Sequence, residues 1–424
     1  MTDRPAPGPR TAAACRRAPE ISCGLRKIHR GRLLGAIIAL APVTAAAQVE
    51  VEAGQVRAEI HVIASLDWRD VQGHPESSRV DLRRARIGIT GALFARVEYE
   101  VEHDFREADR PWRDAFVNAP FGRAIEARVG RFKIPFSLDQ LTPAAELDFV
   151  ARSLGAQYLA PGRDIGAMAH GRLFARRVRF QTGVFRAGGD NVRPAERRDP
   201  RHGAVVAGRL LYRPWSERVE AGPLRALAIG AALTAGGVPE GYYSVRGHTA
   251  ADAPLFPEVA VQGLRRRYGA EIDWRAGPLA LGGEIMRVVD ERRGQSTDDE
   301  RLPDIVARGW YVRGTWLATG ERKTDRVRPA RSVLRGGIGA IELAARLEDL
   351  ALSSRGAGGV PTRSARGDTL VAVGDRAATL GVNWYLSRFL KVQAHTTRDW
   401  RREDGAAVDA RRAWNQRLRV QFAL

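Results

Sequence analysis

The sequence predicts an all-β fold, a transmembrane antiparallel β-barrel of about sixteen strands with one long loop folded into its lumen. Three observations favour this fold. Strand-like alternation of apolar and polar residues recurs along the chain. Short and long connections between these segments largely alternate, as they do in bacterial barrels. One irregular stretch, residues 135–163, is long for a compact domain, and such loops are usually functional.

The first 47 residues carry the features of an export signal. A basic flank that includes Arg26 and Lys27 precedes an apolar run over residues 33–43, and three alanines follow as a small-residue cleavage pattern. We therefore expect a signal peptide over residues 1–47 and a barrel domain over residues 48–424. The segment before the apolar run is longer than such a signal needs, which favours a translation start further along the chain.

Both cysteines, Cys15 and Cys23, lie within the predicted signal, so disulfide and cysteine–zinc chemistry are not expected in the mature chain. The signal also holds 8 of the 68 Lys+Arg and 2 of the 49 Asp+Glu, which leaves a net charge of +13 in the remainder. A basic excess suits nucleic acid, anionic surfaces or anionic solutes. Export argues against nucleic acid, and no later run of ~20 apolar residues predicts a transmembrane helix.

The first segment after the signal has the period of a strand. From Val56 to Trp68, every second residue is apolar, and the residues between them are mostly polar. Residues 93–105 repeat the pattern, with Glu98 and Glu100 on the polar face. A soluble sandwich could alternate in the same way. A face that is charged at nearly every position favours a water-filled lumen instead.

The same reading applied to the whole chain predicts about sixteen strands, a number that transmembrane barrels adopt. The last of them places Leu418, Val420, Phe422 and Leu424 on one face, as a closing strand would. The predicted strands cover residues 55–69, 79–91, 93–105, 112–119, 124–134, 164–175, 178–187, 204–213, 224–236, 263–275, 279–289, 307–319, 333–347, 373–386, 388–400 and 411–424.

The connections between these strands support a barrel with short turns at one end and long loops at the other. One connection, residues 320–332, breaks the alternation, because it is long and basic where a short turn is expected. The short connections lie near residues 91–92, 175–177, 276–278 and 387, and the long ones near 135–163, 188–203, 237–262, 290–306 and 348–372.

Several sequence blocks together resemble the phosphate-selective porin O and P family. Their order and spacing, over roughly residues 80–424, carry the resemblance more than any single block does. The blocks are residues 83–86 (RRAR), 130–138 (GRFKIPFSL), 149–153 (FVARS), 161–166 (PGRDIG), 309–312 (GWYV), 319–321 (TGE), 339–346 (GAIELAAR) and 381–386 (GVNWYL).

This resemblance implies a sixteen-stranded barrel of the bacterial outer membrane that passes anions through a basic lumen, with residues 135–163 as its constriction loop. It also implies a homotrimer surrounded by outer-membrane lipid and lipopolysaccharide. Inorganic anions are the expected solutes, with phosphate or polyphosphate as the first candidates. Lys133 is the only lysine in residues 128–166, the stretch around the predicted constriction loop, so the sequence leaves a strict phosphate preference open.

An anion-selective pore needs fixed positive charge where its water column is narrow. Arginine adds a planar fork that can hold two phosphate oxygens. For each candidate, a salt bridge within the loop or at the surface is an equally good interpretation, most of all for Arg163 beside Asp164. The candidates are Arg131, Lys133, Arg152 and Arg163 around the loop, and Arg84, Arg86 and Arg128 on nearby strands.

Three other functions stay open from the sequence. A general or non-phosphate porin would use the same barrel, whereas an outer-membrane enzyme or a secreted basic binding protein would not need a lumen. An enzyme would need a positioned nucleophile and base. The histidines are scattered without metal-ligand spacing, so we expect no catalytic site, no metal site and no cofactor.

Overall fold

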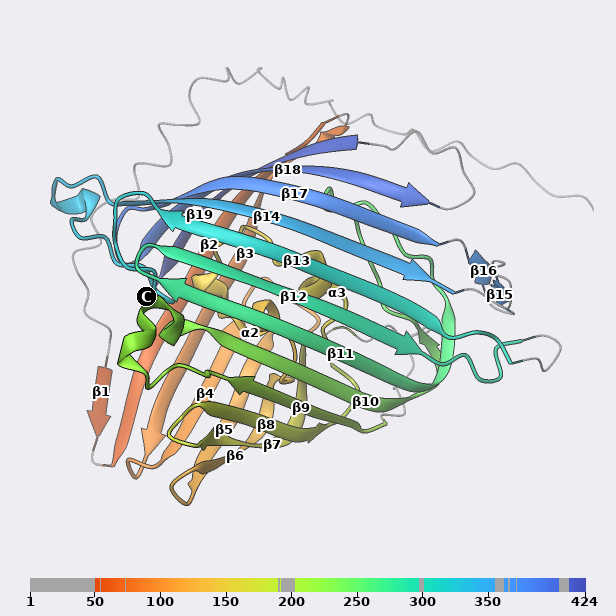
Figure 1. Ribbon diagram of the computed structural model, residues 1–424, viewed down its shortest axis with the longest axis horizontal. Coiled ribbons are helices and arrows are strands. Elements are labelled where there is room, and N and C mark those ends of the chain that lie inside the picture. Colours follow the sequence, from red (N-terminus) through yellow and green to blue (C-terminus); the bar gives the residue numbers. More distant parts are fainter. Residues whose placement is uncertain are drawn as a thin grey trace, which may run out of the picture. The chain divides into compact units, whose positions relative to one another are not determined.

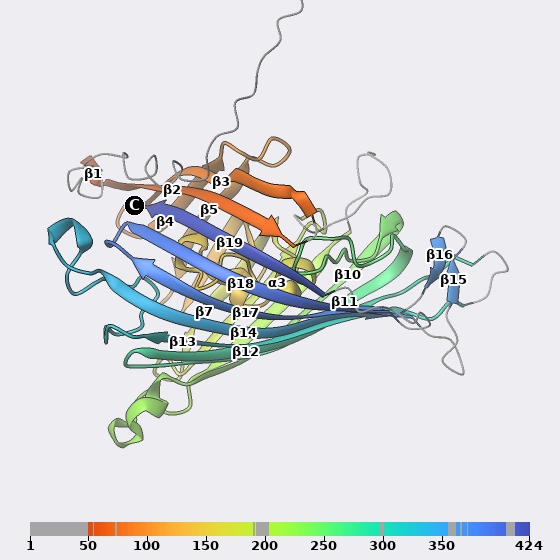
Figure 2. The ribbon, with the colours of Figure 1, turned by 90° about the horizontal axis from the view of Figure 1, so that it is seen from above.

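The computed structural model describes residues 50–53, 55–72, 74–189, 191, 203–296, 301–354, 362–364, 367–370, 372–403 and 412–424. The predicted signal peptide lies outside the described residues. Sixteen antiparallel strands pair in chain order and the last pairs with the first, which closes the sheet into a barrel (Figures 1 and 2). The predicted sixteen-stranded β-barrel is therefore confirmed.

The first half of the barrel begins with β2 (Val56–Val71), which pairs with the next strand and also with the final strand of the chain. A short additional strand, β1 (Glu50–Ala53), pairs with this first barrel strand outside the ring of sixteen. The eight strands of this half are β2 (Val56–Val71), β3 (His74–Leu93), β4 (Val97–Asp104), β5 (Trp112–Phe121), β6 (Ile125–Lys133), β7 (Arg163–Leu173), β8 (Val178–Phe185) and β9 (Val205–Tyr212).

The second half continues in the same antiparallel order, with a small two-stranded sheet, β15 (Thr362–Ser364) and β16 (Gly367–Leu370), inserted in one connection. The eight strands are β10 (Ala228–Tyr243), β11 (Ala260–Ala276), β12 (Leu279–Asp290), β13 (Ile305–Leu317), β14 (Ala340–Ser353), β17 (Val373–Tyr385), β18 (Leu390–Glu403) and β19 (Arg412–Ala423). The short helices are α2 (Leu138–Leu141), η1 (Ala144–Glu146), α3 (Leu154–Tyr158), η2 (Val219–Ala226) and η3 (Val333–Arg335).

Residues alternate between the two faces of the wall along each strand. On β13, Arg313 points inward and is buried, whereas its neighbour Val312 points outward and is 60% exposed. Because successive side chains of a strand project to opposite faces, this pattern gives the barrel an apolar outer surface and a polar interior. No helix among the described residues is long and apolar enough to cross a membrane.

Two predicted strand starts fall in helical turns and are too early, and a third, residue 93, falls at the end of β3, so that β4 begins only at Val97. The strand predicted from residue 333 begins at Ala340, because Gly336 (φ 72°) and Gly339 (φ 74°) adopt left-handed conformations that end η3 and turn the chain. The strand predicted from residue 224 begins at Ala228, because Pro223 and its neighbours form η2. In both places an apolar residue pattern continued through a helical turn.

The long connection predicted as an exception is confirmed. β13 ends at Leu317 and β14 begins at Ala340, so residues 318–339 join two strands at the end of the barrel that mostly carries short turns. This end lies on the left in Figure 1, together with the C-terminus. Residues 213–227, which include η2, form a second longer connection at the same end.

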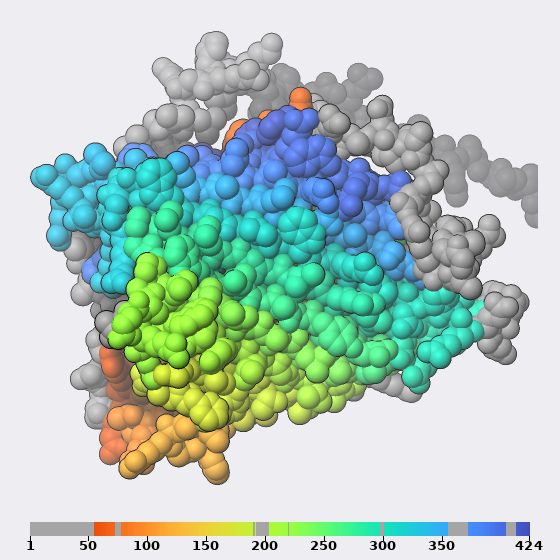
Figure 3. Space-filling view, in the orientation of Figure 1, coloured from red at the N-terminus to blue at the C-terminus, as the bar shows by residue number. Residues whose placement is uncertain are grey.

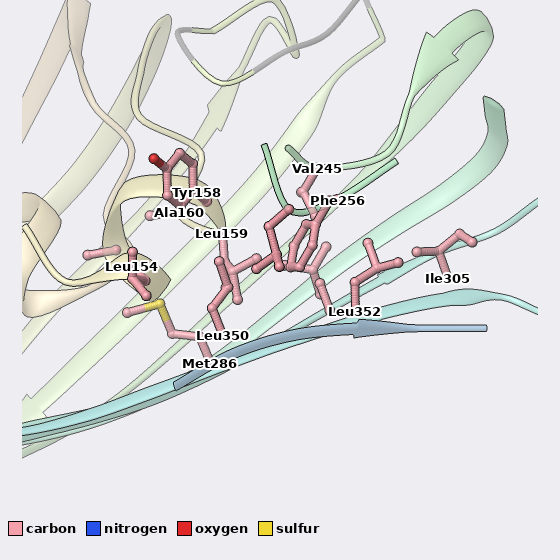
Figure 4. Packing of buried hydrophobic residues seen from close by; sticks show 14 of the residues in the cluster. Leu154, Tyr158, Leu159, Ala160, Val245, Phe256, Met286, Ile305, Leu350 and Leu352 are labelled. Atoms are coloured by element: carbon pink, nitrogen blue, oxygen red, sulfur yellow. The ribbon is translucent and has the colours of Figure 1, made fainter. Parts of the chain in front are cut away.

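Two connections from the other end fold into the barrel. Residues 134–162, between β6 and β7, carry α2 and α3 into the interior (Figures 1 and 2). Residues 244–259, between β10 and β11, meet the first segment there. Figure 4 shows Leu154 and Leu159 of the first segment beside Val245 and Phe256 of the second, above the wall.

The contact between the two inward segments forms the main apolar core of the barrel. Phe136 and Leu159 are fully buried in it, and the wall contributes Met286 from β12 and Leu350 from β14. Burying such a side chain fully contributes about 1.5–3 kcal/mol relative to leaving it exposed. The apolar residues of these loops therefore help to hold them inside the lumen.

Candidate pore constriction

Polar side chains of the wall hold the loop between β6 and β7 by its backbone. Lys391 and Gln393 on β18 donate hydrogen bonds to the carbonyl of Leu147, at 2.9 Å and 3.3 Å. Asn383 on β17 donates to the carbonyl of Asp148 at 2.8 Å. These bonds satisfy backbone groups that an irregular buried segment would otherwise leave unpaired.

The helix α3 is fixed against β13 and β14. The backbone N–H of Leu154 donates to Glu348 Oε2 at 2.6 Å, and Arg346 Nη1 donates to the carbonyl of Ala151 at 2.9 Å. The approach is close, because a Cβ placed on Gly309 would lie 3.0 Å from the Cα of Gly155. A side chain at Gly309 would therefore push the helix away from the wall, whereas a Cβ at Gly155 would lie at an ordinary contact distance of 3.6 Å from the Cα of Gly309.

A buried ion cluster fixes the middle of the loop. Asp148 contacts Lys323 from the long connection 318–339, and Arg313 Nη1 lies 3.4 Å from its Oδ2. Lys323 also contacts Glu342 on β14. Burial opposes ionisation of Asp148, but Lys323 and Arg313 outweigh it and lower its pKa to about 2. The loop is therefore tied to the wall by a carboxylate that stays charged at ordinary pH.

The loop leaves a large cavity beside it, with a volume of about 2140 Å³. The residues that line this cavity include 23 Arg and Lys against 14 Asp and Glu, an excess of nine positive charges. They come from the inward faces of the strands, from the loop itself and from residues 246–252 of the second inward segment. The described lining of the cavity therefore carries a net positive charge.

Six of the seven residues predicted from the sequence line this cavity, namely Arg84, Arg86, Arg128, Lys133, Arg152 and Arg163. Five of them lie close enough to influence one another electrostatically. Arg86 and Arg163 act on both Lys133 and Arg152, and Arg152 also acts on Arg84. Burial, and then repulsion by its arginine neighbours, lowers the pKa of Arg152 to about 10, which still leaves it protonated near neutral pH.

The partners of these cations differ. Arg86 Nε donates to Asp104 Oδ2 at 2.7 Å, and Arg163 Nη2 donates to Asp114 Oδ2 at 2.5 Å. Lys133 instead donates to the carbonyls of Leu141 and Thr142, each at 3.1 Å.

Arg84 is the least neutralised cation of the group. Its Nη1 is buried and has no hydrogen-bond partner, and no acidic residue among those described forms an ion pair with it. Buried charges are normally paired, so such a guanidinium is suited to an anion from solution.

Arg128 and Arg131 lie on opposite faces of β6. Arg128 is in the lumen and stacks over Phe116, with its Cζ 4.0 Å from the ring centroid. Arg131 is not among the described residues that line the cavity, and its Nε donates to the carbonyl of Trp112 at 2.9 Å. The two residues are three positions apart, so strand alternation sends them to opposite sides.

The sequence reading missed Arg83, which also lines the cavity. Simple alternation would turn Arg83 outward if Arg84 pointed inward. The pairing of β2 with β3 shifts here, because Ser65 lies opposite Arg84 while the next residue, Leu66, lies opposite Leu82. Arg83 is the extra residue of a β-bulge, and the bulge lets adjacent arginines reach the lumen.

The second inward segment was also missed. Asp252 pairs with Arg69 of β2 at 2.8 Å, and the backbone N–H of Ala250 donates to Asp375 of β17 at 2.9 Å. His248 stacks on Tyr158 of α3, with ring centroids 5.5 Å apart. Val245 and Phe256 could have indicated from the sequence that this segment folds inward, because large apolar residues are unusual in a loop that stays in water.

Histidines within the barrel serve as hydrogen-bonding groups. His395 Nδ1 accepts from the backbone N–H of Val150, and His170 Nε2 lies 2.7 Å from Asn118 Oδ1. Within the described ranges, no group of three or more His, Cys, Asp or Glu is arranged to hold a metal ion.

Comparisons with known proteins agree with this geometry. The family model for phosphate-selective porin O and P matches residues 55–424. Porin O of Pseudomonas aeruginosa is 28% identical over 135 residues, which is 30% of this chain and 28% of that protein. The chain thus aligns with less than a third of the length of this relative.

Two solved structures share the fold at low sequence identity. One is the trimer form of OmpT, an outer membrane protein of Vibrio cholerae, with a TM-score of 0.56, 10% identity, and coverage of 87% of this chain and 99% of OmpT. The other is the anion-selective porin of Comamonas acidovorans, with a TM-score of 0.53, 12% identity, and coverage of 87% and 100%. Since the family model covers most of the chain, this protein belongs to the phosphate-selective porin O and P family, as a β-barrel of the bacterial outer membrane.

Proposed function

We propose that this protein is a porin that lets small anions diffuse across the outer membrane in preference to cations. The observation that carries the proposal is the basic cavity beside the inward loop, with its excess of nine positive charges and the unpaired Nη1 of Arg84. Fixed cations at a narrow point favour anions because they replace part of the lost hydration. The family and the fold favour a channel over an enzyme.

The proposed constriction is the cluster of Arg84, Arg86, Lys133, Arg152 and Arg163, with residues 134–162 as the loop that narrows the lumen. Arg128 contributes further along the same wall. Arg131 is left out, because it does not line the cavity. The cations bind weakly enough for release, since Arg86 and Arg163 are already partly neutralised by Asp104 and Asp114.

Phosphate is the first solute to test, on the strength of the family description and of the arginine forks. A general anion porin is the second candidate. Acidic residues such as Glu100, Glu102 and Asp114 line the same cavity, and Lys133 is the only lysine among the described residues of its lining, which favours a weaker and broader preference.

The test is a planar-bilayer measurement of the reversal potential in a KCl gradient, repeated with phosphate added. A potential displaced toward the anion equilibrium supports the proposal, and a cation-selective or unselective pore would end it. Concentration-dependent block of the chloride current by phosphate would favour the phosphate channel, and its absence the general anion porin. Soluble protein that forms no channels would reject both.

We also propose that the protein assembles as a homotrimer. The trimer form of OmpT shares the fold, and the outer surface of the barrel carries many exposed apolar side chains that either lipid or a neighbouring copy can cover. Mass measurement of the detergent-solubilised protein by light scattering tests this directly, and a monomer at all protein concentrations would exclude it.

A further inference from the structure

Five arginines gather on the outer surface of the barrel, where neither the lumen nor the loops use them. We call them the outer arginine cluster: Arg287 on β12, Arg308 on β13, Arg376 on β17, and Arg398 and Arg402 on β18. Each occupies an outward position of its strand, in register with the apolar residues of the wall. Figure 3 shows the outer surface over this part of the barrel, coloured green to blue.

The strand register brings these arginines together. Arg287 lies directly opposite Arg308 across the β12–β13 pair. Arg308 and Arg402 lie on one line across the wall, with only Ala351 and Gly374 between them. The guanidinium of Arg402 extends over Gly374, where an added Cβ would lie 3.0 Å from its Nη2.

The cluster has too few acidic partners of its own. Asp349 is the single carboxylate that contacts it among the described residues, at 3.3 Å from Arg376 and 2.5 Å from Arg402. Arg287 and Arg308 are exposed, and no ion pair with an acid occurs for either within the described ranges. Like charges directly opposite one another destabilise a sheet, so a multivalent anion bound between these arginines would reduce their repulsion and stabilise the sheet.

The cluster also lies at the level where a membrane becomes polar. Eight residues along β13 separate Arg308 from Trp316, and eight along β17 separate Arg376 from Trp384. At about 3.4 Å per residue and a tilt of about 40°, each spacing crosses roughly 20 Å, close to the ~25 Å height of the apolar band of such barrels.

Aromatic rings accompany the arginines, as they do at membrane interfaces. Arg398 lies over the rings of Trp414 and Trp400, at 5.2 Å and 5.5 Å from their centroids. The two tryptophan levels therefore bracket the lipid, and the cluster marks the headgroup level at the end that carries the inward loop.

We propose that the outer arginine cluster binds the phosphorylated headgroup of lipopolysaccharide in the outer leaflet. Five arginines against one aspartate leave four positive charges, which a phospholipid with one phosphate would neutralise poorly and a glycolipid with several phosphates would neutralise well. Long loops face outward in bacterial barrels, which places this end in the outer leaflet. The site does not depend on the ion preference of the lumen.

The test uses the protein refolded in detergent without lipopolysaccharide, with binding measured by native mass spectrometry. The probes are deep-rough lipopolysaccharide, monophosphorylated lipid A, phosphatidylglycerol and inorganic phosphate. Lipopolysaccharide should bind most tightly. The triple variant Arg308→Gln, Arg376→Gln, Arg402→Gln should lose roughly tenfold or more in affinity, since exposed charge pairs contribute only modestly one by one.

Two further variants make the result specific. Arg131→Gln on β6 removes an arginine outside both the cluster and the cavity lining, and should bind like the wild type. Asp349→Asn removes the internal competitor, and should bind lipopolysaccharide more tightly, which a poorly folded variant could not do. Wild-type affinity in the triple variant, or equal affinity for phosphatidylglycerol, would overturn the proposal. Protection of the cluster by a second copy instead of by lipid would overturn it as well.

Discussion

Lys391 on β18 and Arg84 on β3 both face the barrel interior, yet their surroundings differ. Lys391 donates to the carbonyls of Ala145 and Leu147, and is enclosed by the loop that it holds. Arg84 borders the cavity, and its Nη1 has no partner. Along β12–β18 the interior cations are mostly committed to the loop, whereas along β2–β8 they mostly face the water column.

The comparison shows why a count of basic residues does not give the charge that a solute meets. A cation whose donors are taken by carbonyls and carboxylates behind the loop acts at a distance, and salt screens charges beyond ~8–10 Å. A cation on the cavity surface acts at close range. A pair of unit charges at 4 Å is worth about 1 kcal/mol in water and about 4 kcal/mol at an effective dielectric constant of 20.

The largest expected effect comes from removing the inward loop between β6 and β7. Deletion of residues 138–158, closed by a short glycine linker, should raise single-channel conductance roughly twofold or more, because the loop fills much of the lumen. Heat-modifiable gel migration serves as the control for a folded barrel. Unchanged conductance in a folded variant would show that the loop does not narrow the pore.

A smaller effect is expected from loosening the loop at its anchor. Asp148→Asn removes the carboxylate that Lys323 and Arg313 share, and leaves Lys323 with Glu342 and Arg313 with Asp273. The cost should therefore lie below the ~3–5 kcal/mol of a buried ion pair in which one charge is left with no partner. The current should become noisy, with added open levels, as the loop leaves the wall. Asp325→Asn is the matched control, because Asp325 is 70% exposed. A quiet trace from the Asp148 variant would contradict the anchoring role.

Neutralising an acidic residue that lines the cavity should change the ion selectivity without moving the inward loop. Glu102→Gln removes one of the two carboxylates that neutralise Arg86, 3.2 Å away, and leaves Asp104 at 2.7 Å, so the cavity lining gains net positive charge. The reversal potential should move further toward anions, while conductance changes little. No shift, or a shift toward cations, would mean that this part of the cavity lining does not set the selectivity of the pore.

The smallest effect is expected from acid. Because Lys323 and Arg313 overcome burial and depress the pKa of Asp148 to about 2, its stabilisation is complete above the unfolded value near 3.9 and is lost as pH falls toward 2. Loop-dependent noise should therefore stay constant from pH 7 to about 4, and rise only below that. A rise already between pH 6 and 5 would assign the loop's stability to another group.

The period of the sequence was enough to predict the sixteen strands, because an outward apolar face and an inward polar face repeat at every second residue. It was also enough to bring Lys133, Arg152 and Arg163 to one region, since Lys133 and Arg163 flank the loop that carries Arg152. The bulge at Arg83 could not be predicted, because one extra residue reverses the alternation without any change in composition.

The partners of the interior cations could not be predicted from the sequence either. Whether a lysine meets a carbonyl, as Lys391 does, or borders water depends on where two loops pack after the barrel closes. The fold of residues 244–259 into the lumen depends on the same contacts, in which Val245 and Phe256 bury themselves against the wall. Local patterns specify the faces of strands and leave such long-range choices undetermined.

The most direct test of the account compares two charge reversals that differ only in the face they alter. Arg84→Glu places a negative charge on the cavity surface, whereas Arg131→Glu places it outside the lumen. Both change the net charge equally, so the reversal potential in a KCl gradient reports position alone. We predict a clear displacement toward cations for Arg84→Glu and wild-type selectivity for Arg131→Glu. Equal shifts of the reversal potential in both variants, or no shift in Arg84→Glu, would contradict the assignment of selectivity to the cations that line the cavity.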